Sequence, residues 1–352
     1  MINLTRNYPV LPTQHETFKA FVADYNSRYN DWLTIIPFGG REQDREAAAQ
    51  LTPGIDPGRI QIATGGHHGC LVIILAAGLQ GKAIAVEDLS YPAFTDIAKL
   101  LGCPIVSCAT DEHGLIPSAL EQACVHHGVR GVYLMPTVHN PTGRVMPLQR
   151  RHDLITIARK HGTIILDDDA YGFLDTAAIP NFAQLAPDLG WYLNSVSKPL
   201  GPDIKVAYIA SPQGTQEAIA DAIKLTTSNP SAFFTGLVSE LIRTGQYAST
   251  VGQKRLEGNR RQALVRAHWP TASITAHPNS WHLWVQVPPG TTASSIAAQA
   301  GQAGVSIIPG TAFSTAAPAG HQHFRVALGA EPNDTRLLQA IATLSQIFAQ
   351  HQ

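Results

Sequence analysis

The chain has 352 residues and a formal net charge of −1, so it is long enough for one large core or two closely packed domains. A nearly neutral charge argues against a general nucleic-acid or membrane surface role, and we expect neither partner. The longest apolar run, Cys70 to Gly78, is too short to cross a bilayer, and the N-terminus lacks a signal-peptide core; a cytoplasmic protein is expected.

Short apolar runs with β-branched residues alternate with helical stretches through the first two thirds of the chain. This alternation predicts a mostly parallel sheet with helices on both faces, and such sheets bind ligands at the ends of their strands. The expected strands are 60–63, 83–86, 104–107, 131–135, 163–167, 191–195 and 205–210, and the expected helices include 92–102, 117–128 and 147–161. From about residue 240 a long polar helix, three strands at 282–287, 305–308 and 324–328, and a helix at 334–349 indicate a smaller α+β domain.

The first candidate ligand segment is Thr64-Gly65-Gly66-His67-His68, which joins a strand to a helical apolar run. Paired glycines before a helix leave backbone amides free to bind a phosphate at the positive helix end. Taken alone, the pattern is weak, and a histidine at a helix start is often only a cap. Tyr91 follows the next strand in a Tyr-Pro turn, where an aromatic often packs without any ligand.

Two further strand ends carry polar residues. Asn140-Pro141-Thr142-Gly143 follows the strand at 131–135 and by itself reads as a tight turn. The strand at 163–167 runs into Asp167-Asp168-Asp169 and Tyr171; three adjacent acids repel one another and leave a metal site as one alternative. The histidine pairs elsewhere lack thiol or carboxylate partners at ligand spacing, and the four cysteines have no C-x-x-C spacing, so we predict no metal and reduced thiols.

The segment from Ser195 to Lys205 is the most informative, because it holds Ser195, Ser197, Lys198 and a second cation, Lys205. Two hydroxyls and a cation suit a phosphate, which leaves the Lys198 amine to bind an aldehyde carbon. A serine-rich loop with an incidental lysine is the alternative reading.

These segments together resemble the fold-type I pyridoxal phosphate enzymes, whose lysine motif commonly reads S-x-S-K-x-x-x-P-G-x-R-x-G-Y. The closest likeness is to class I/II aminotransferases, in particular MocR-type aminotransferase domains and aminoadipate/kynurenine aminotransferases. The resemblance implies an α/β fold with a mostly parallel seven-stranded sheet in a large domain at 41–240. It also implies that 1–40 packs with 241–352 in the small domain.

The same resemblance assigns roles residue by residue. Lys198 would form the internal aldimine and move the proton, Asp168 would pair with the ring nitrogen, and Tyr171 would bond the ring oxygen. Asn140 would contact the ring hydroxylate and the substrate, and Arg325, in His323-Phe324-Arg325, would bind the substrate carboxylate. The remaining cofactor contacts would be Tyr91, stacked on the ring, and a phosphate set made of Gly66, His67, Ser195, Ser197 and Lys205. Asp167 and Asp169 alternate away from Asp168 and receive no role.

The chain departs from the family pattern at two places. Lys205 stands where the family has a phosphate arginine, so it keeps the charge but loses the two-pronged geometry. Ile35 stands where a tyrosine usually reaches the phosphate of the neighbouring subunit. A homodimer remains the expected assembly, but a phosphate contact from the partner becomes doubtful.

We therefore predict an aminotransferase with pyridoxal 5′-phosphate as cofactor and an α-amino acid and a 2-oxo acid as substrates. One alternative keeps the cofactor but changes the reaction to β- or γ-elimination, cyclisation or oxidative deamination in a specialised biosynthetic pathway. The other is a ligand-sensing domain like that of the regulators. We expect no winged-helix segment here, and all the catalytic positions are filled, which argues against sensing.

Overall fold

A seven-stranded sheet forms the centre of the larger unit in this computed structural model, which describes residues 1–316 and 318–351. The strand β10 runs antiparallel to both of its neighbours, and the other pairs are parallel. In sheet order the strands are β2 (Ile60–Ala63), β10 (Ala207–Ala210), β9 (Gly190–Ser195), β8 (Ile164–Asp168), β7 (Gly131–Leu134), β3 (Ile84–Glu87) and β4 (Ile105–Cys108).

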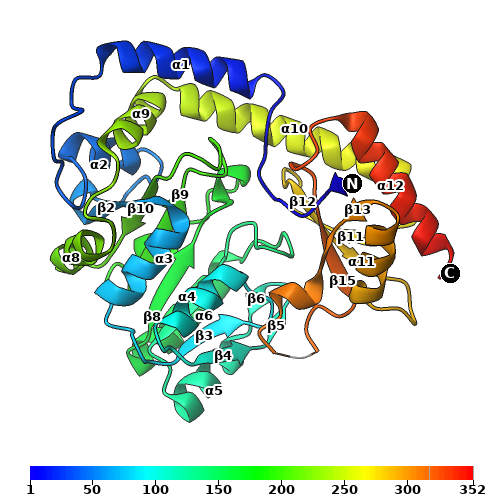
Figure 1. The fold of residues 1–352 in the computed structure, drawn as a ribbon. Coiled ribbons are helices and arrows are strands. Elements are labelled where there is room, and N and C mark those ends of the chain that lie inside the picture. Colours follow the sequence, from blue (N-terminus) through cyan, green and yellow to red (C-terminus); the bar gives the residue numbers. More distant parts are fainter. Residues whose placement is uncertain (317, 352) are drawn as a thin grey trace.

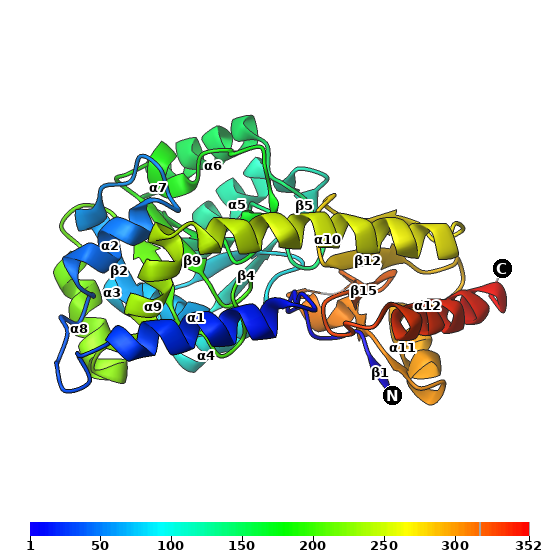
Figure 2. The ribbon, with the colours of Figure 1, turned by 90° about the horizontal axis from the view of Figure 1, so that it is seen from above.

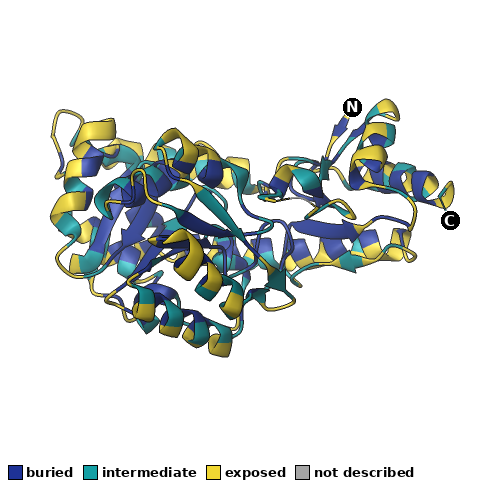
Figure 3. Cartoon of the chain, turned by 90° about the horizontal axis from the view of Figure 1, so that it is seen from below, coloured by how far each residue is buried: buried dark blue, intermediate teal, exposed yellow. Residues whose placement is uncertain are grey.

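Helices cover both faces of this sheet (Figure 1). Alternation along β7 shows why: Tyr133 belongs to one buried cluster, whereas Val132 and Leu134 belong to another on the opposite face. The first cluster is closed by α3 (Gly65–Ala76), α4 (Pro92–Leu100) and α8 (Gln216–Thr227), and the second by α5 (Pro117–His127), α6 (Leu148–His161) and α7 (Phe182–Leu185). A third cluster lies beneath α2 (Glu42–Ala49) and α9 (Ala232–Arg243). The strands of the sheet are almost entirely buried (Figure 3), except the edge strand β4, in which only Cys108 is buried.

The smaller unit has its own sheet and its own core. Its four strands, in sheet order, are β11 (Ile274–Thr275), β12 (His282–Gln286), β15 (His323–Ala327) and β14 (Ile308–Pro309). The helices α11 (Ala293–Gln302) and α12 (Asp334–Ala349) pack on it. Helix α10 (Gln246–His268) runs from one unit to the other (Figures 1 and 2). Near its start, Tyr247 packs in the third cluster, and near its end, Val265 packs in the core of the small unit.

The N-terminal segment touches both units. Strand β1 (Ile2–Asn3) pairs in parallel with β13 (Val305–Ser306) of the small unit, and Leu4 is buried in that unit's core. In contrast, α1 (Gln14–Arg28) places Phe18 and Phe21 against the third cluster of the large unit. Residues 1–40 therefore do not all pack on the small unit as expected, and the division at residues 40 and 240 stays a prediction.

Most expected elements are found within two residues of their predicted ends, but the strand expected at 305–308 is split. Its first part, β13, pairs with β1, and its second part, β14, pairs with β15. The sequence pattern does not predict the hairpin formed by two short antiparallel strands, β5 (Thr110–Asp111) and β6 (Gly114–Leu115). Across the residues described, no helix combines the length and the apolar character needed to span a membrane.

Candidate active site

A cavity of about 260 Å³ lies between the ends of the sheet strands and the N-terminal segment. Every residue predicted to contact the cofactor lines it, although the segments come from five separate strand ends. Arg325 is not among the lining residues. The wall consists of Tyr8, Thr64, Gly65, Gly66, His67, His68, Tyr91, Met135, Asn140, Asp168, Ala170, Tyr171, Ser195, Ser197, Lys198 and Lys205.

The Lys198 amine is held by the N-terminal segment. Its Nζ donates to the carbonyl oxygen of Asn7 at 3.0 Å and lies 3.6 Å from the ring centre of Tyr8. Burial, opposed by Tyr8 and assisted by Arg325, lowers the pKa of Lys198 to about 8. The free, nucleophilic amine is therefore far more abundant near neutral pH than for an ordinary lysine. No sequence motif pointed to Asn7 or Tyr8.

One end of the cavity has the features of an anion site. Helix α3 begins there with Gly65 and Gly66, and a Cβ added at Gly66 would lie 3.3 Å from Cβ of Ser195. Ser195 Oγ lies 3.0 Å from Ser197 Oγ, and the Lys205 side chain also lines this wall. The Thr64 hydroxyl is buried without a partner among the described residues. A phosphate group fits these donors and the positive end of the helix.

The rim next to this end is formed by His67 and Tyr91. His67 Nε2 lies 3.0 Å from the Tyr91 hydroxyl. Desolvation and the charges of Lys205 and Lys198 lower the pKa of His67, which favours its neutral form. His68 instead accepts from the backbone amide of Thr64 at the start of the helix.

Asp168 is the acid that faces the cavity. The hydroxyl of Tyr133 donates to Asp168 Oδ2 at 2.7 Å. Burial raises the pKa of Asp168 to about 6, with this hydrogen bond acting in the opposite direction, so the carboxylate is mostly ionised at neutral pH. The buried tyrosine was not predicted, because nothing in the strand pattern distinguishes it from an ordinary core aromatic.

The neighbouring acids have other partners. Asp167 accepts from the backbone amide of Phe182 at 3.0 Å, and Asp169 accepts from the hydroxyl of Tyr192 at 2.6 Å. Within residues 1–316 and 318–351, no group of three or more histidine, cysteine or acidic side chains is arranged to hold a metal ion. Each of the three acids thus has its own hydrogen-bond partner.

Arg325 reaches the cavity through Asn140. Its Nη1 donates to Asn140 Oδ1 at 2.7 Å, and its Nη2 donates to the carbonyl oxygen of Thr5 at 2.5 Å. Burial lowers the pKa of Arg325, its Nε has no partner, and no carboxylate of the described chain pairs with it. A buried guanidinium with only neutral acceptors is prepared for an incoming carboxylate.

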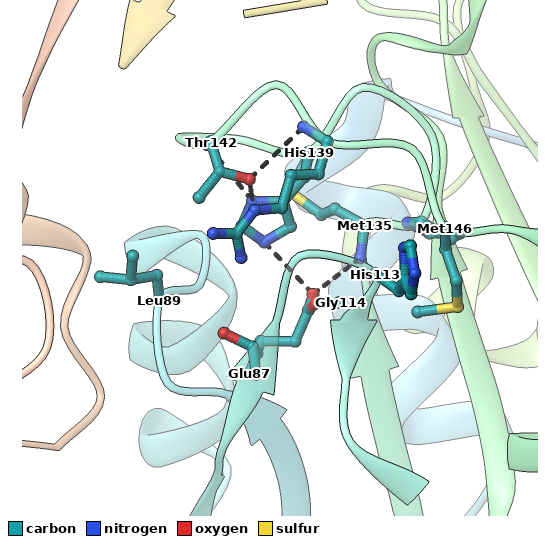
Figure 4. A pocket seen from close by; sticks show the side chains of 11 residues that line it. Glu87, Leu89, His113, Gly114, Met135, His139, Thr142 and Met146 are labelled. Carbon is teal, nitrogen blue, oxygen red and sulfur yellow. Dashed lines mark hydrogen bonds and ion pairs between the residues drawn. The ribbon is translucent and has the colours of Figure 1, made fainter. Parts of the chain in front are cut away.

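The loop that carries Asn140 is braced from below (Figure 4). His139 Nε2 lies 3.2 Å from Glu87 Oε2, and its Nδ1 lies 3.0 Å from the hydroxyl of Thr142. The cavity beside this pair measures only about 10 Å³, which is room for about one water molecule. This pocket therefore supports the loop and is too small for a substrate.

A second brace comes from the small unit. His282 is fully buried, and burial followed by the charge of Arg325 lowers its pKa to about 3. The neutral ring accepts from Asn7 Nδ2 at 2.9 Å through Nδ1 and donates from Nε2 to the carbonyl oxygen of His139 at 3.2 Å. The one ring thus joins β12, the Asn140 loop and the N-terminal segment.

Comparison with known proteins agrees with this geometry. Residues 1–344 match the family described as "Aminotransferase class I and II". The 2-aminoadipate transaminase of Thermus thermophilus is 26% identical over 271 residues, covering 74% of this chain and 68% of that protein. The HTH-type transcriptional regulator YdeF of Bacillus subtilis is 24% identical over 324 residues, covering 91% of this chain and 70% of the regulator.

A solved structure confirms the predicted fold class. The α-aminoadipate aminotransferase LysN of Thermus thermophilus, complexed with N-(5′-phosphopyridoxyl)-L-leucine, superposes with a TM-score of 0.85 at 21% identity. The match covers 99% of this chain and 92% of that structure. The fold is that of the fold-type I aminotransferases.

Proposed function

This chain belongs to the family of class I and II aminotransferases, and we propose that it moves an amino group between an α-amino acid and a 2-oxo acid with pyridoxal 5′-phosphate bound at Lys198. The observation that carries the proposal is the cavity itself. It joins an amine of lowered pKa, an anion-binding end and a buried carboxylate, and a guanidinium lies beside it.

When bound, the cofactor supplies an aldehyde that takes up the amino group and a ring that withdraws electrons from the substrate. Its phosphate would be held by the start of α3 with Gly66, Ser195, Ser197 and Lys205, and by the free hydroxyl of Thr64. His67 and Tyr91 would close the rim above it.

The ring end has a complementary set. Asp168, fixed by the Tyr133 hydroxyl, would accept a hydrogen bond from the protonated ring nitrogen and hold the proton there. Asn140 and Tyr171 lie on the same cavity wall, where they would contact the ring oxygen.

Lys198 would serve twice. Its amine would hold the cofactor at the aldehyde carbon and, when free, would accept and return the proton of the substrate Cα. A pKa of about 8 suits both tasks, because an acid–base group works best when it titrates near the working pH. Arg325 would hold the substrate carboxylate and so fix the position of that Cα.

A homodimer and a cytoplasmic location complete the proposal. The loop before α2 exposes Leu33 at 99% and Ile35 at 83%, and a subunit interface would cover such apolar side chains. The side chain of Ile35 has no polar atom for the phosphate of a neighbouring subunit, so its contact there would be apolar.

Two other functions remain to be separated by experiment. The similarity to the HTH-type transcriptional regulator YdeF supports a second candidate, a sensing domain that would bind its ligand without turnover. A different reaction of the same cofactor would use the same residues but release the product in another form.

The test is incubation of the cofactor-loaded protein with single amino acids and a 2-oxo acid acceptor, with amino-acid analysis of the products. Transamination yields one new amino acid for each amino acid consumed, and Lys198→Ala should yield none. Ammonia without a product amino acid would replace the proposal by elimination or deamination. A spectral change without any product would indicate sensing.

A further inference from the structure

Helix α10 carries a lysine into the interior of the protein. Lys254 is 0% exposed, and its Nζ donates to the carbonyl oxygen of Pro9 at 2.6 Å and to that of Lys198 at 3.2 Å. No carboxylate among residues 1–316 and 318–351 forms an ion pair with it. Both partners are neutral backbone oxygens.

The charge of such a lysine costs the folded state free energy. Burial alone lowers the pKa of Lys254 to about 7, which means that its charged form is disfavoured where it lies. Apolar residues of similar volume often replace buried charged groups at no loss of stability. We therefore attribute the role of Lys254 to its hydrogen bonds with the two carbonyl oxygens.

The two carbonyl oxygens lie on either side of the contact between Lys198 and the N-terminal segment. Lys198 supplies the amine, while Pro9 directly follows Asn7 and Tyr8, whose carbonyl oxygen and ring hold that amine. The ammonium of Lys254 therefore ties the backbone of residue 198 to the backbone of residue 9. The next residue on the helix, Arg255, also binds two carbonyls, those of Phe173 and Asp175, and is a natural control.

We propose that Lys254 is a positioning residue for Lys198: it fixes the segment Asn7–Tyr8–Pro9 against residue 198 and so keeps the Lys198 amine oriented and shielded from water. This inference rests on the proposed function in one respect only: that function makes the Lys198 amine the group that binds the cofactor. The hydrogen bonds of Lys254 join protein groups alone, so the contact can be measured in cofactor-free protein.

The experiment uses the cofactor-free protein. Trace labelling of amines with acetic anhydride from pH 6 to 10.5, followed by mass spectrometry of the peptide that contains Lys198, gives the apparent pKa of this one amine. Hydrogen exchange of residues 5–12 is measured on the same samples. The proteins are wild type, Lys254→Met, Lys254→Gln, Lys254→Arg and Arg255→Met.

Burial is the largest cause of the low pKa of Lys198, so loss of the shielding segment should move that pKa upward. We expect a rise of about one unit in Lys254→Met, with faster exchange of residues 5–12. Lys254→Arg, which keeps a donor, should change little, and Lys254→Gln should be intermediate. Tyr8, Arg325 and Asp168 face the same amine and are unchanged in every variant.

An unshifted Lys198 titration and unchanged exchange in a folded Lys254→Met would overturn the proposal, as would an equal shift in Arg255→Met. If circular dichroism shows that Lys254→Met does not fold, the pKa of Lys198 is compared in wild type, Lys254→Arg and Lys254→Gln. It should rise in that order, and equal values in the three proteins would contradict the proposal. In the loaded enzyme, Lys254→Met should lower kcat with little change in KM. Failure of the cofactor to bind Lys198 in wild type would remove the proposed function but leave the labelling result intact.

Discussion

Three consecutive carboxylates, Asp167, Asp168 and Asp169, meet three different surroundings at the end of β8. Only Asp168 lines the cavity, where the Tyr133 hydroxyl holds it. Burial raises the pKa of Asp167 to about 7 and also raises that of Asp169. The strand alternation thus separates the acid that lines the cavity from two acids that bond within the protein.

Asp168→Asn should weaken cofactor binding and reduce kcat/KM by about 100-fold or more, since losing one partner of a buried charged pair costs about 3–5 kcal/mol. Asp167→Asn keeps the shape and should have little effect on either quantity. Cofactor titration and steady-state kinetics measure both. Equal losses at the two positions would contradict the separate roles.

Arg325→Ala should leave the colour of the cofactor-loaded protein unchanged while kcat/KM falls by about 30-fold to several thousand-fold, which corresponds to about 2–5 kcal/mol. Arg325→Lys should recover only part of this loss, because it restores the charge without the paired geometry. Amines without a carboxylate provide the control and should respond little to either change. Loss of colour would show that Arg325 binds the cofactor and not the substrate.

Lys254 makes the stability of the protein depend on pH. Its pKa is lowered from 10.5 to about 7 on folding, so the unfolded chain binds more protons between these values and the cost of burying the charge falls as pH rises through this window. Relative to Lys254→Met, the wild type should gain up to about 3 kcal/mol between pH 7 and pH 9.5, at about 1.4 kcal/mol per pH unit. Urea unfolding at the two pH values measures this. A constant difference would mean that Lys254 is not buried as a titrating amine.

Element by element, the sequence predicts the structure where the information is local. Strand β9 and the residues after it carry Ser195, Ser197 and Lys198 within four positions, so one segment predicts one side of the cavity. Prediction fails where a contact joins distant positions: Lys198 and Asn7 are separated by 191 residues, and β13 is a strand only because β1 pairs with it. No local pattern encodes such pairings.

The start of α3 can be tested by a single methyl group. Gly66→Ala should lower cofactor affinity by about 10-fold, or about 1.4 kcal/mol, because the new Cβ would lie 3.3 Å from Ser195 Cβ at the anion-binding end. Gly252→Ala is the control: nothing lies within 4 Å of its Cβ position on α10, and it should stabilise the helix by about 0.5–1 kcal/mol. Fluorescence titration with the cofactor gives the affinities, and unaltered binding in Gly66→Ala would place the phosphate elsewhere.

For the whole molecule, the cavity lies between the large unit and the N-terminal segment, and the small unit reaches it through the bond of Arg325 to Asn140. His282 of the small unit, Asn7 of the N-terminal segment and Asn140 of the large unit belong to one network. The change of pattern near residue 240 predicted a second, smaller unit. The course of residues 1–40 over both units could not be read from the sequence, since Leu4 and Phe18 are alike apolar and only the fold places them against different cores.

The central claim is that Lys198 is the residue that binds the cofactor, and one measurement tests it directly. The protein is saturated with pyridoxal 5′-phosphate, reduced with borohydride and digested, and the modified peptide is identified by mass spectrometry. We predict a single phosphopyridoxyl group, on Lys198, at one per chain, and none in Lys198→Ala. Modification of Lys205, Lys254 or any other lysine in place of Lys198 would contradict the account.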